Sequence, residues 1–339
     1  MSTTTEERAK SRFQLIFRMA VSAGLMIWLM LMIEWDEALR VMKEGSPLFL
    51  WAAFLAIQIT VATSIWKWKM LVDSSDTSKQ SDYSTMTQLG KLYYIGLFFN
   101  NFMPGSVGGD VIRIYYLGKN TSAATAAASV LFERITSGIA LVGIVLISAL
   151  FMDQSRPYLI SLLVLLAISA AVYLLIKLLL KKDHSNPFDK TSSGKINGYV
   201  MKGKQAIRKF GETAKNYQNK GWKWWSMIML LSLLFQAGMA WINDLLFLSF
   251  GIDVPFLHLL VIITLISVIT MLPVSLNGLG VREAGYIFFF QGLGVPDEIA
   301  LSVSLLFFVL VTISSSIGGL FWLVERRRVH HEIIGQQAD

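Results

Sequence analysis

The chain alternates long apolar runs with short polar segments. The apolar runs long enough to matter are Phe13–Ile33, Leu48–Leu71, Ser122–Phe151, Tyr158–Leu180, Trp224–Phe250 and Ile299–Val324. A helix rises about 1.5 Å per residue, so each run can cross a hydrocarbon core roughly 30 Å thick. The pattern predicts an all-α polytopic membrane protein with six full transmembrane helices. Phe13–Ile33 is longer than a signal-peptide core and is not followed by a small-residue cleavage site, so we expect it to be retained.

Two further apolar segments are too short to span. Leu89–Met103 and Leu257–Leu272 reach only about 22–24 Å as helices, and each runs into a break rich in Pro and Gly. The stretch from Pro104 to Arg113 and the stretch from Pro273 to Arg282 both read P-x-S-x-x-G-x-x-x-R, 169 residues apart. The shared motif indicates an internal repeat of two broken helices.

The number of crossings between the two motifs predicts how they are related. If each motif is the tip of a re-entrant hairpin, three predicted spans separate the tips, so one hairpin enters from each side of the membrane. This inverted repeat is typical of transporters that bind substrate where broken helices meet near the midplane. The boundaries of the short return arms, Val111–Leu117 and Gly285–Leu293, are less defined, and the first arm could merge with the span that follows it.

Composition agrees with a membrane location. Hydrophobic residues make up 54% of the chain and charged residues 16%, with a mean hydropathy of +0.54. These values exclude a soluble enzyme with one core, a disordered chain and a nucleic-acid-binding module. The chain has no Cys and only four His, so thiolate chemistry is excluded and we expect no metal or other cofactor.

The distribution of basic residues predicts the orientation. Residues 181–223 contain eleven Lys and Arg, and cations also occur in the tails 1–12 and 326–339, whereas the opposite loops are acidic. The positive-inside rule therefore places both termini in the cytoplasm, with the membrane domain, residues 13–325, in the plasma or inner membrane. Residues 181–223 form a basic amphipathic connector that either lies on anionic headgroups or packs on its own protein.

Several polar residues within the apolar regions are candidates for a substrate site. Helices that begin after Gly109 and Gly278 would direct N–H groups and a positive dipole end toward an anion, with Arg113 and Arg282 one turn further on. The alternative is that these arginines pair with Asp110 or Glu133, and with Glu283 or Asp244, to hold the fold together. The full candidate set is Asn100, Pro104, Gly108, Gly109, Asp110, Arg113, Glu133, Arg134, Asp244, Pro273, Gly278, Gly280, Arg282 and Glu283.

Two details refine this set. Glu133 and Arg134 lie about 17 Å along a predicted span, near the middle of the bilayer, where a charge requires a partner or water. A cycle coupled to protons or cations through Glu133 or Asp244 is open alongside static pairing. The small residues Gly318 and Gly319 are typical of a helix-packing surface.

The motifs 100–113 (NNFMPGSVGGDVIR), 129–134 (SVLFER) and 272–284 (LPVSLNGLGVREA) resemble those of the flippase-like membrane domain family. That family includes the membrane portion of lysylphosphatidylglycerol synthetase, the multiple peptide resistance factor. The resemblance covers residues 13–325 and implies a translocase, not an enzyme, that moves an anionic, aminoacylated or polyprenyl-linked lipid between leaflets. The chain ends at Asp339, so we expect no soluble aminoacyl-transfer domain and no lysyl transfer.

Two other functions stay open. The acidic residues Glu34, Asp36 and Glu37 could hold a metal in a glycosyl- or phospho-transferase that uses a polyprenyl phosphate, although the short outer loops argue against an acceptor site. The chain could also be a non-transporting partner of a separate lipid synthase. The expected partners are a membrane phospholipid or polyprenyl phosphate, that synthase, and a second copy of the chain in a homodimer, but no nucleic acid.

Overall fold

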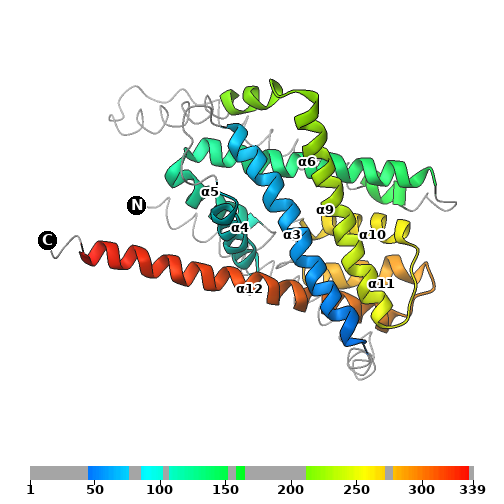
Figure 1. Ribbon diagram of the computed structural model, residues 1–339. Coiled ribbons are helices and arrows are strands. Elements are labelled where there is room, and N and C mark those ends of the chain that lie inside the picture. Colours follow the sequence, from blue (N-terminus) through cyan, green and yellow to red (C-terminus); the bar gives the residue numbers. More distant parts are fainter. Residues whose placement is uncertain are drawn as a thin grey trace, which may run out of the picture.

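The computed structural model describes residues 45–75, 85–101, 107–151, 158–164, 211–271 and 278–335 (Figure 1). All regular secondary structure within these ranges is helical. The labelled helices are α3 (Pro47–Ser75), α4 (Met86–Asn100), α5 (Val107–Asn120), α6 (Ala123–Ala149), α9 (Trp222–Ser249), α10 (Phe256–Met271), α11 (Val281–Gln291) and α12 (Asp297–Gly335). The prediction of an all-α protein is confirmed for this part of the chain.

Four of the six predicted spans appear as helices that are long and apolar enough to cross a membrane. They are α3, α6, α9 and the segment Asp297–Val324 of α12. The predicted span Phe13–Ile33 lies outside the described residues, and of Tyr158–Leu180 only residues 158–164 are described, as helix. The count of six spans, the two tails and the orientation therefore stay predictions.

The two short apolar segments form two pairs of short helices. Helix α4 packs against α5, and α10 packs against α11, with the repeated motif at each connection. Pro104 and Pro273 lie in the connections 102–106 and 272–277, outside the described residues. The return arm after the first motif does not merge with the next span, because Ser122 caps α6 by accepting a hydrogen bond from the Thr125 amide at 3.0 Å.

Close backbone crossings hold the long helices together. Helices α3 and α9 run antiparallel, since the amide of Ser46 just before α3 donates to the carbonyl of Ser249 at the end of α9, at 3.1 Å. A Cβ on Gly238 would lie 2.4 Å from Thr60 Oγ1, and one on Gly318 would lie 1.9 Å from the carbonyl oxygen of Tyr94 on α4. The prediction that Gly318 belongs to a packing surface is confirmed, because α12 could not approach α4 this closely with a larger residue.

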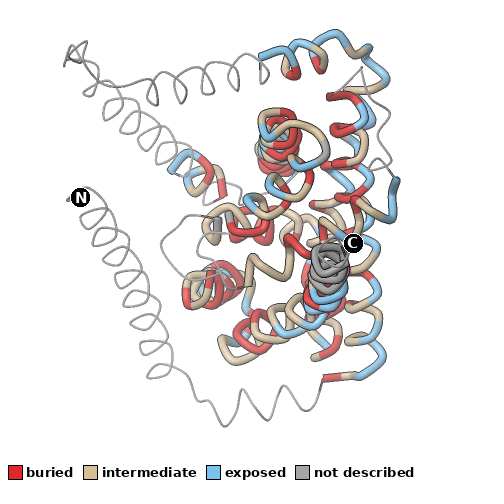
Figure 2. The backbone as a smooth tube through the Cα atoms, turned by 90° about the vertical axis from the view of Figure 1, so that its left-hand side faces the viewer, coloured by how far each residue is buried: buried red, intermediate tan, exposed pale blue. Residues whose placement is uncertain are grey.

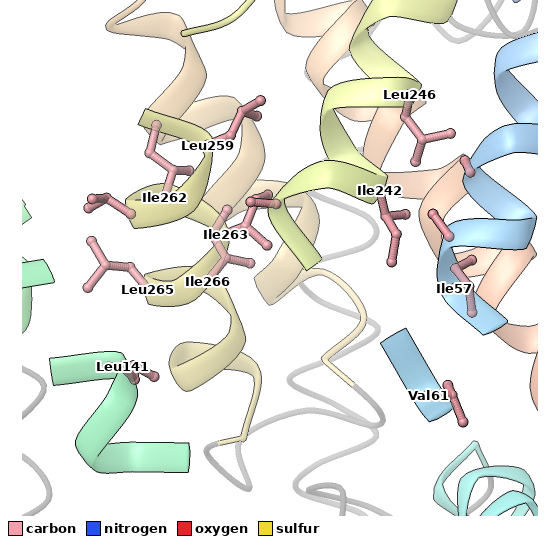
Figure 3. Close-up of a cluster of buried hydrophobic side chains, with 14 of the residues drawn as sticks. Ile57, Val61, Leu141, Ile242, Leu246, Leu259, Ile262, Ile263, Leu265 and Ile266 are labelled. Carbon is pink, nitrogen blue, oxygen red and sulfur yellow. The ribbon is translucent and has the colours of Figure 1, made fainter. Parts of the chain in front are cut away.

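The hydrophobic core joins the long helices to the second short pair. In Figure 3, Leu141 of α6 and Ile242 of α9 lie on either side of the apolar side chains of α10, and Ile57 of α3 lies beyond Ile242. Buried residues line the facing sides of the helices and exposed residues lie on the outer sides (Figure 2). The exposed residues include many large apolar side chains, such as Leu48 and Ile147, as expected for surfaces that contact lipid.

The described end of the basic connector packs on the protein itself. Residues 211–218 are helical, and the fully buried Tyr217 stacks on Trp224 with ring centroids 5.7 Å apart. The Tyr217 hydroxyl donates to the carbonyl of Leu71 at 2.9 Å, and burial raises the pKa of this hydroxyl above its ordinary value. For this end of the connector, packing on the protein is the observed arrangement; residues 181–210 lie outside the described part of the chain.

Candidate functional site

Five charged side chains from three helices meet in the interior, and we call them the charge cluster: Lys67, Asp110, Arg113, Glu133 and Arg134. Arg113 of α5 forms a buried ion pair with Glu133 of α6 through Nη2 and Oε2. Its Nη1 also lies 3.5 Å from Asp110 Oδ1, one turn earlier in α5. The sequence left open whether Arg113 pairs with Asp110 or with Glu133, and the structure shows that it contacts both.

Arg134 is paired with Asp110, but its side chain is far more accessible than that of Arg113. Its Nε and Nη2 donate to the two oxygens of Asp110 at 2.9 and 3.0 Å, a bidentate pair. The Arg134 side chain is 37% exposed, whereas that of Arg113 is 5% exposed. Of the two arginine side chains, that of Arg134 is the more accessible.

Lys67 completes the cluster, and the sequence analysis missed it. Its Nζ donates to the carbonyl oxygen of Glu133 at 3.0 Å and to Ser137 Oγ at 2.7 Å, and the residue is only 2% exposed. The available signal was a lysine inside the run Leu48–Leu71, since intramembrane charges usually face a functional interior. Its neighbour Lys69 instead pairs with Asp73 on the surface.

Two aromatic rings position Arg113. Its Cζ lies 4.1 Å from the ring centroid of Trp68 and 4.4 Å from that of Tyr93. The two centroids are only 6.1 Å apart, so the rings form a corner around the guanidinium and not a sandwich. Both aromatic side chains are also hydrogen-bonded. Tyr93 OH donates to Glu133 Oε1 at 3.3 Å, and Trp68 Nε1 donates to Ser129 Oγ at 3.1 Å.

The start of α5 is closed by its own protein. The amide of Gly109 donates to Asn100 Oδ1 at 2.6 Å, which satisfies one of the unpaired N–H groups of the first turn. A Cβ on Gly109 would lie 2.2 Å from the carbonyl oxygen of Gly96, so α4 and α5 cross in direct backbone contact. The adjacent Gly108 is also buried. Because Asn100 bonds the Gly109 amide, Asn100 is a positioning residue for α5.

From the position of the cluster along the candidate spanning helices, we expect it to lie inside the hydrocarbon region. Lys67 precedes the end of α3 at Ser75 by about 12 Å, and Arg134 follows the start of α6 at Ala123 by about 16 Å. A charge at such depth costs several kcal/mol unless it has partners or water. The ion pairs explain how these charges are tolerated.

A second, smaller cluster occupies the other short pair. Arg282 and Glu283 pair at 2.5 Å, Arg282 Nε also donates to Ser304 Oγ of α12 at 3.1 Å, and the guanidinium lies 4.8 Å from the centroid of Phe308. The amide of Gly280 donates to Glu283 Oε2 at 2.6 Å. Arg282 is 8% exposed and Glu283 1% exposed, so this cluster is closed.

Two glycines shape the backbone before α11. Gly278 has φ of +75° and Gly280 has φ of +81°, a region that residues with a Cβ rarely adopt. A Cβ on Gly278 would also lie 2.9 Å from the Thr270 side chain of α10. These glycines allow the tight turn that leads into α11, and at the start of α11 the Gly280 amide bonds Glu283.

Asp244 is not part of either cluster. It lies on α9, five residues before the helix ends at Ser249, and is partly exposed. The sequence left Glu283 and Asp244 as alternative partners for Arg282, and Glu283 is the observed one. The buried polar residue of this region is the preceding Asn243, whose Oδ1 accepts from Tyr286 OH at 2.5 Å.

The two clusters are separate in the described part of the chain. Arg113 contacts residues of α3, α4, α5 and α6, whereas Arg282 contacts residues of α11 and α12. In Figure 1 the pair α4–α5 and the pair α10–α11 appear on opposite sides of α3. The contacts of the described residues therefore place Arg113 and Arg282 in two separate ion-paired clusters.

No metal site accompanies these charges in the described residues, which hold no group of three or more His, Asp or Glu placed to bind an ion. The acidic residues Glu34, Asp36 and Glu37 lie outside the described ranges.

Long apolar helices, two pairs of short helices joined at a repeated motif, and paired charges at membrane depth define a polytopic helical membrane protein with a polar interior. Residues 15–319 match the family described as lysylphosphatidylglycerol synthase TM region, and the chain belongs to this family. The resemblance drawn from the motifs is confirmed.

Three archaeal relatives are similar over most of the chain. A UPF0104 membrane protein of Pyrococcus horikoshii is 23% identical over 327 residues, covering 89% of this chain and 95% of the relative. A UPF0104 membrane protein of Methanocaldococcus jannaschii is 26% identical over 307 residues, covering 84% of this chain and 87% of the relative. A UPF0104 membrane protein of Methanothermobacter thermautotrophicus is 24% identical over 293 residues, covering 79% of this chain and 80% of the relative.

Proposed function

We propose that this protein is a lipid translocase that moves a phospholipid with a phosphate-containing headgroup between the leaflets of the cell membrane. One observation carries the proposal: a cluster of three cations and two carboxylates lies at membrane depth, with the Arg134 guanidinium partly exposed. Intramembrane charges commonly mark a substrate pathway, and the planar guanidinium suits phosphate oxygens. Membership of the lysylphosphatidylglycerol synthase TM region family supports a lipid-related role.

The paired short helices support transport more than catalysis. Broken helices next to each other form the substrate sites of many transporters, and their packing can change by small rigid-body shifts. We propose that α4–α5 and α10–α11 are re-entrant hairpins entering from opposite faces, with the charge cluster as the main headgroup site. The cluster around Arg282 is the counterpart that holds the second hairpin in place.

Reconstitution of the purified chain in liposomes tests the function. The probes are phosphatidylglycerol and phosphatidylcholine carrying a fluorescent acyl chain, with a membrane-impermeant quencher reporting exposure in the outer leaflet. We expect the protein to accelerate phosphatidylglycerol exposure over protein-free liposomes, and Arg134→Gln to reduce the acceleration by at least about tenfold, since the exposed guanidinium is lost.

Lys69→Gln is the matched control, because Lys69 is a cation of α3 that pairs with Asp73 on the surface. It should transport as the wild type does. No acceleration by the folded wild-type protein, or equal rates in Arg134→Gln and Lys69→Gln, would reject the proposal. Sugar or phosphate transfer by the purified protein without lipid exposure would favour the transferase alternative instead.

A further inference from the structure

The charges of the cluster do not balance. Lys67, Arg113 and Arg134 are cations, and Asp110 and Glu133 are the carboxylates that contact them. Lys67 donates only to a carbonyl and a hydroxyl, so it takes up none of the negative charge by a direct ion pair. The cluster therefore carries one formal positive charge more than its partners neutralise. In a medium of low dielectric constant, such an excess favours a bound anion.

Unused hydrogen-bond donors accompany the excess charge. Asp110 occupies Nε and Nη2 of Arg134, and among the described residues Nη1 has no acceptor. Arg113 is 4% exposed, and its Nε is buried without a hydrogen-bond partner within the described residues. A buried donor left unpaired costs about 1–3 kcal/mol, so an acceptor added beside Arg113 Nε would be favoured.

The ligand that these donors fit is an oxyanion. Guanidinium groups bind phosphate oxygens through parallel N–H groups, and the Arg134 side chain is the more accessible of the two arginines. Asp110 lies between Arg113 and Arg134 and contacts both, so its carboxylate sets how many negative charges the cluster already holds. The charge of Asp110 should therefore control the charge that the ligand must bring.

We propose that the charge cluster selects headgroups with a single net negative charge, which are phosphodiesters, over phosphomonoesters. A phosphodiester contributes one negative charge and makes the cluster neutral. A phosphomonoester carries about −1.5 to −2 at neutral pH and leaves an excess of negative charge at membrane depth. A zwitterionic headgroup adds an ammonium for which the cluster provides no further carboxylate. This inference rests on the proposed function and specifies its substrate class.

The test compares three lipids in the same liposome assay. The probes are fluorescent phosphatidylglycerol, a phosphodiester; phosphatidic acid, a phosphomonoester; and phosphatidylcholine, a zwitterion. For the wild type we expect phosphatidylglycerol to move at least about tenfold faster than phosphatidic acid. Asp110→Asn raises the excess of the cluster from one positive charge to two, so the ratio of the two rates should fall by at least about tenfold and favour phosphatidic acid.

A second measurement guards against misfolding of the variant. Short-chain phosphatidylglycerol or phosphatidic acid, added below its micelle concentration, should raise the thermal unfolding midpoint of the detergent-solubilised protein according to the same preference. Lys67→Gln, which removes a cation from the opposite side of the cluster, should abolish stabilisation by phosphatidylglycerol. Lys69→Gln, outside the cluster, should leave it unchanged.

The outcomes separate this inference from the function itself. If the wild type moves phosphatidylglycerol but also moves phosphatidic acid equally fast, the charge rule is wrong and the translocase function stands. The same holds if Asp110→Asn keeps the wild-type ratio in both assays. If the wild type moves none of the three lipids, both proposals fall.

Discussion

At the residue scale, the two arginines of the repeated motif are less accessible than Arg134. Arg113 and Arg282 are buried and paired with carboxylates, and an aromatic ring lies against each guanidinium. Arg134 is the accessible cation. Removing a motif arginine would leave a buried carboxylate without its partner, so such a variant reports on stability before it reports on substrate.

A double-mutant cycle measures the coupling free energy between Arg113 and its partner Glu133. Arg113→Met alone should destabilise the protein by about 3–5 kcal/mol, because Glu133 is left buried and charged. Arg113→Met combined with Glu133→Gln should recover a large part of that loss, since the pair is removed together. Thermal and denaturant unfolding in detergent provide the free energies. Additive effects of the two substitutions would show that the pair is not coupled.

At the element scale, the short helices are positioned by direct backbone contact. Gly96 of α4 and Gly109 of α5 meet where Asn100 caps the first turn of α5, one turn before Arg113. Gly318 of α12 contacts the backbone of α4 on another side. Helix α4 is therefore confined between two neighbours at distances that only glycine permits, and the geometry of the charge cluster depends on that fit.

Gly109→Ala tests the contact between α4 and α5. The new Cβ would lie 2.2 Å from the Gly96 carbonyl oxygen, so the helices must separate, with an expected loss of about 1–3 kcal/mol. Gly138→Ala is the control, because an added Cβ at this exposed position of α6 meets nothing within 4 Å. There the higher helix propensity of alanine should leave stability equal or raise it by up to about 1 kcal/mol. Equal melting shifts in the two variants would contradict the crossing.

At the scale of the whole molecule, the arrangement in the membrane follows from loop charge and from the number of crossings. From the positive-inside rule and three predicted intervening spans, we expect the ends of α4–α5 on the cytoplasmic side and the ends of α10–α11 outside. The antiparallel packing of α3 on α9 agrees with spans that run in opposite directions.

Cysteine labelling in intact cells tests this topology, and the natural absence of Cys makes single substitutions clean reporters. Met86→Cys and Asn219→Cys should react with a membrane-impermeant maleimide only after the cells are permeabilised. Phe256→Cys and Gln291→Cys should react without permeabilisation. All four positions are exposed or near helix ends. Labelling of Met86→Cys and Gln291→Cys from the same side would exclude an inverted repeat.

Features that depend on local composition and periodicity could be predicted from the amino-acid order. Long apolar runs specify spanning helices because unpaired backbone groups are too costly in lipid, and Pro and Gly break the two short segments because they cannot continue a helix. The family motifs and the packing role of Gly318 were likewise readable from residue type and spacing.

Which polar groups meet, and which of them remain accessible, depends on how the helices pack in three dimensions. Lys67, Asp110 and Glu133 come from three helices, and their spacing along the chain carries no information on rotation or crossing angle. For the same reason, two motifs with the same spacing place Arg113 among aromatic rings beside an open Arg134, and Arg282 in a closed pair with Glu283. Ion pairing and exposure depend on side chains from distant segments, and these are set by helix packing.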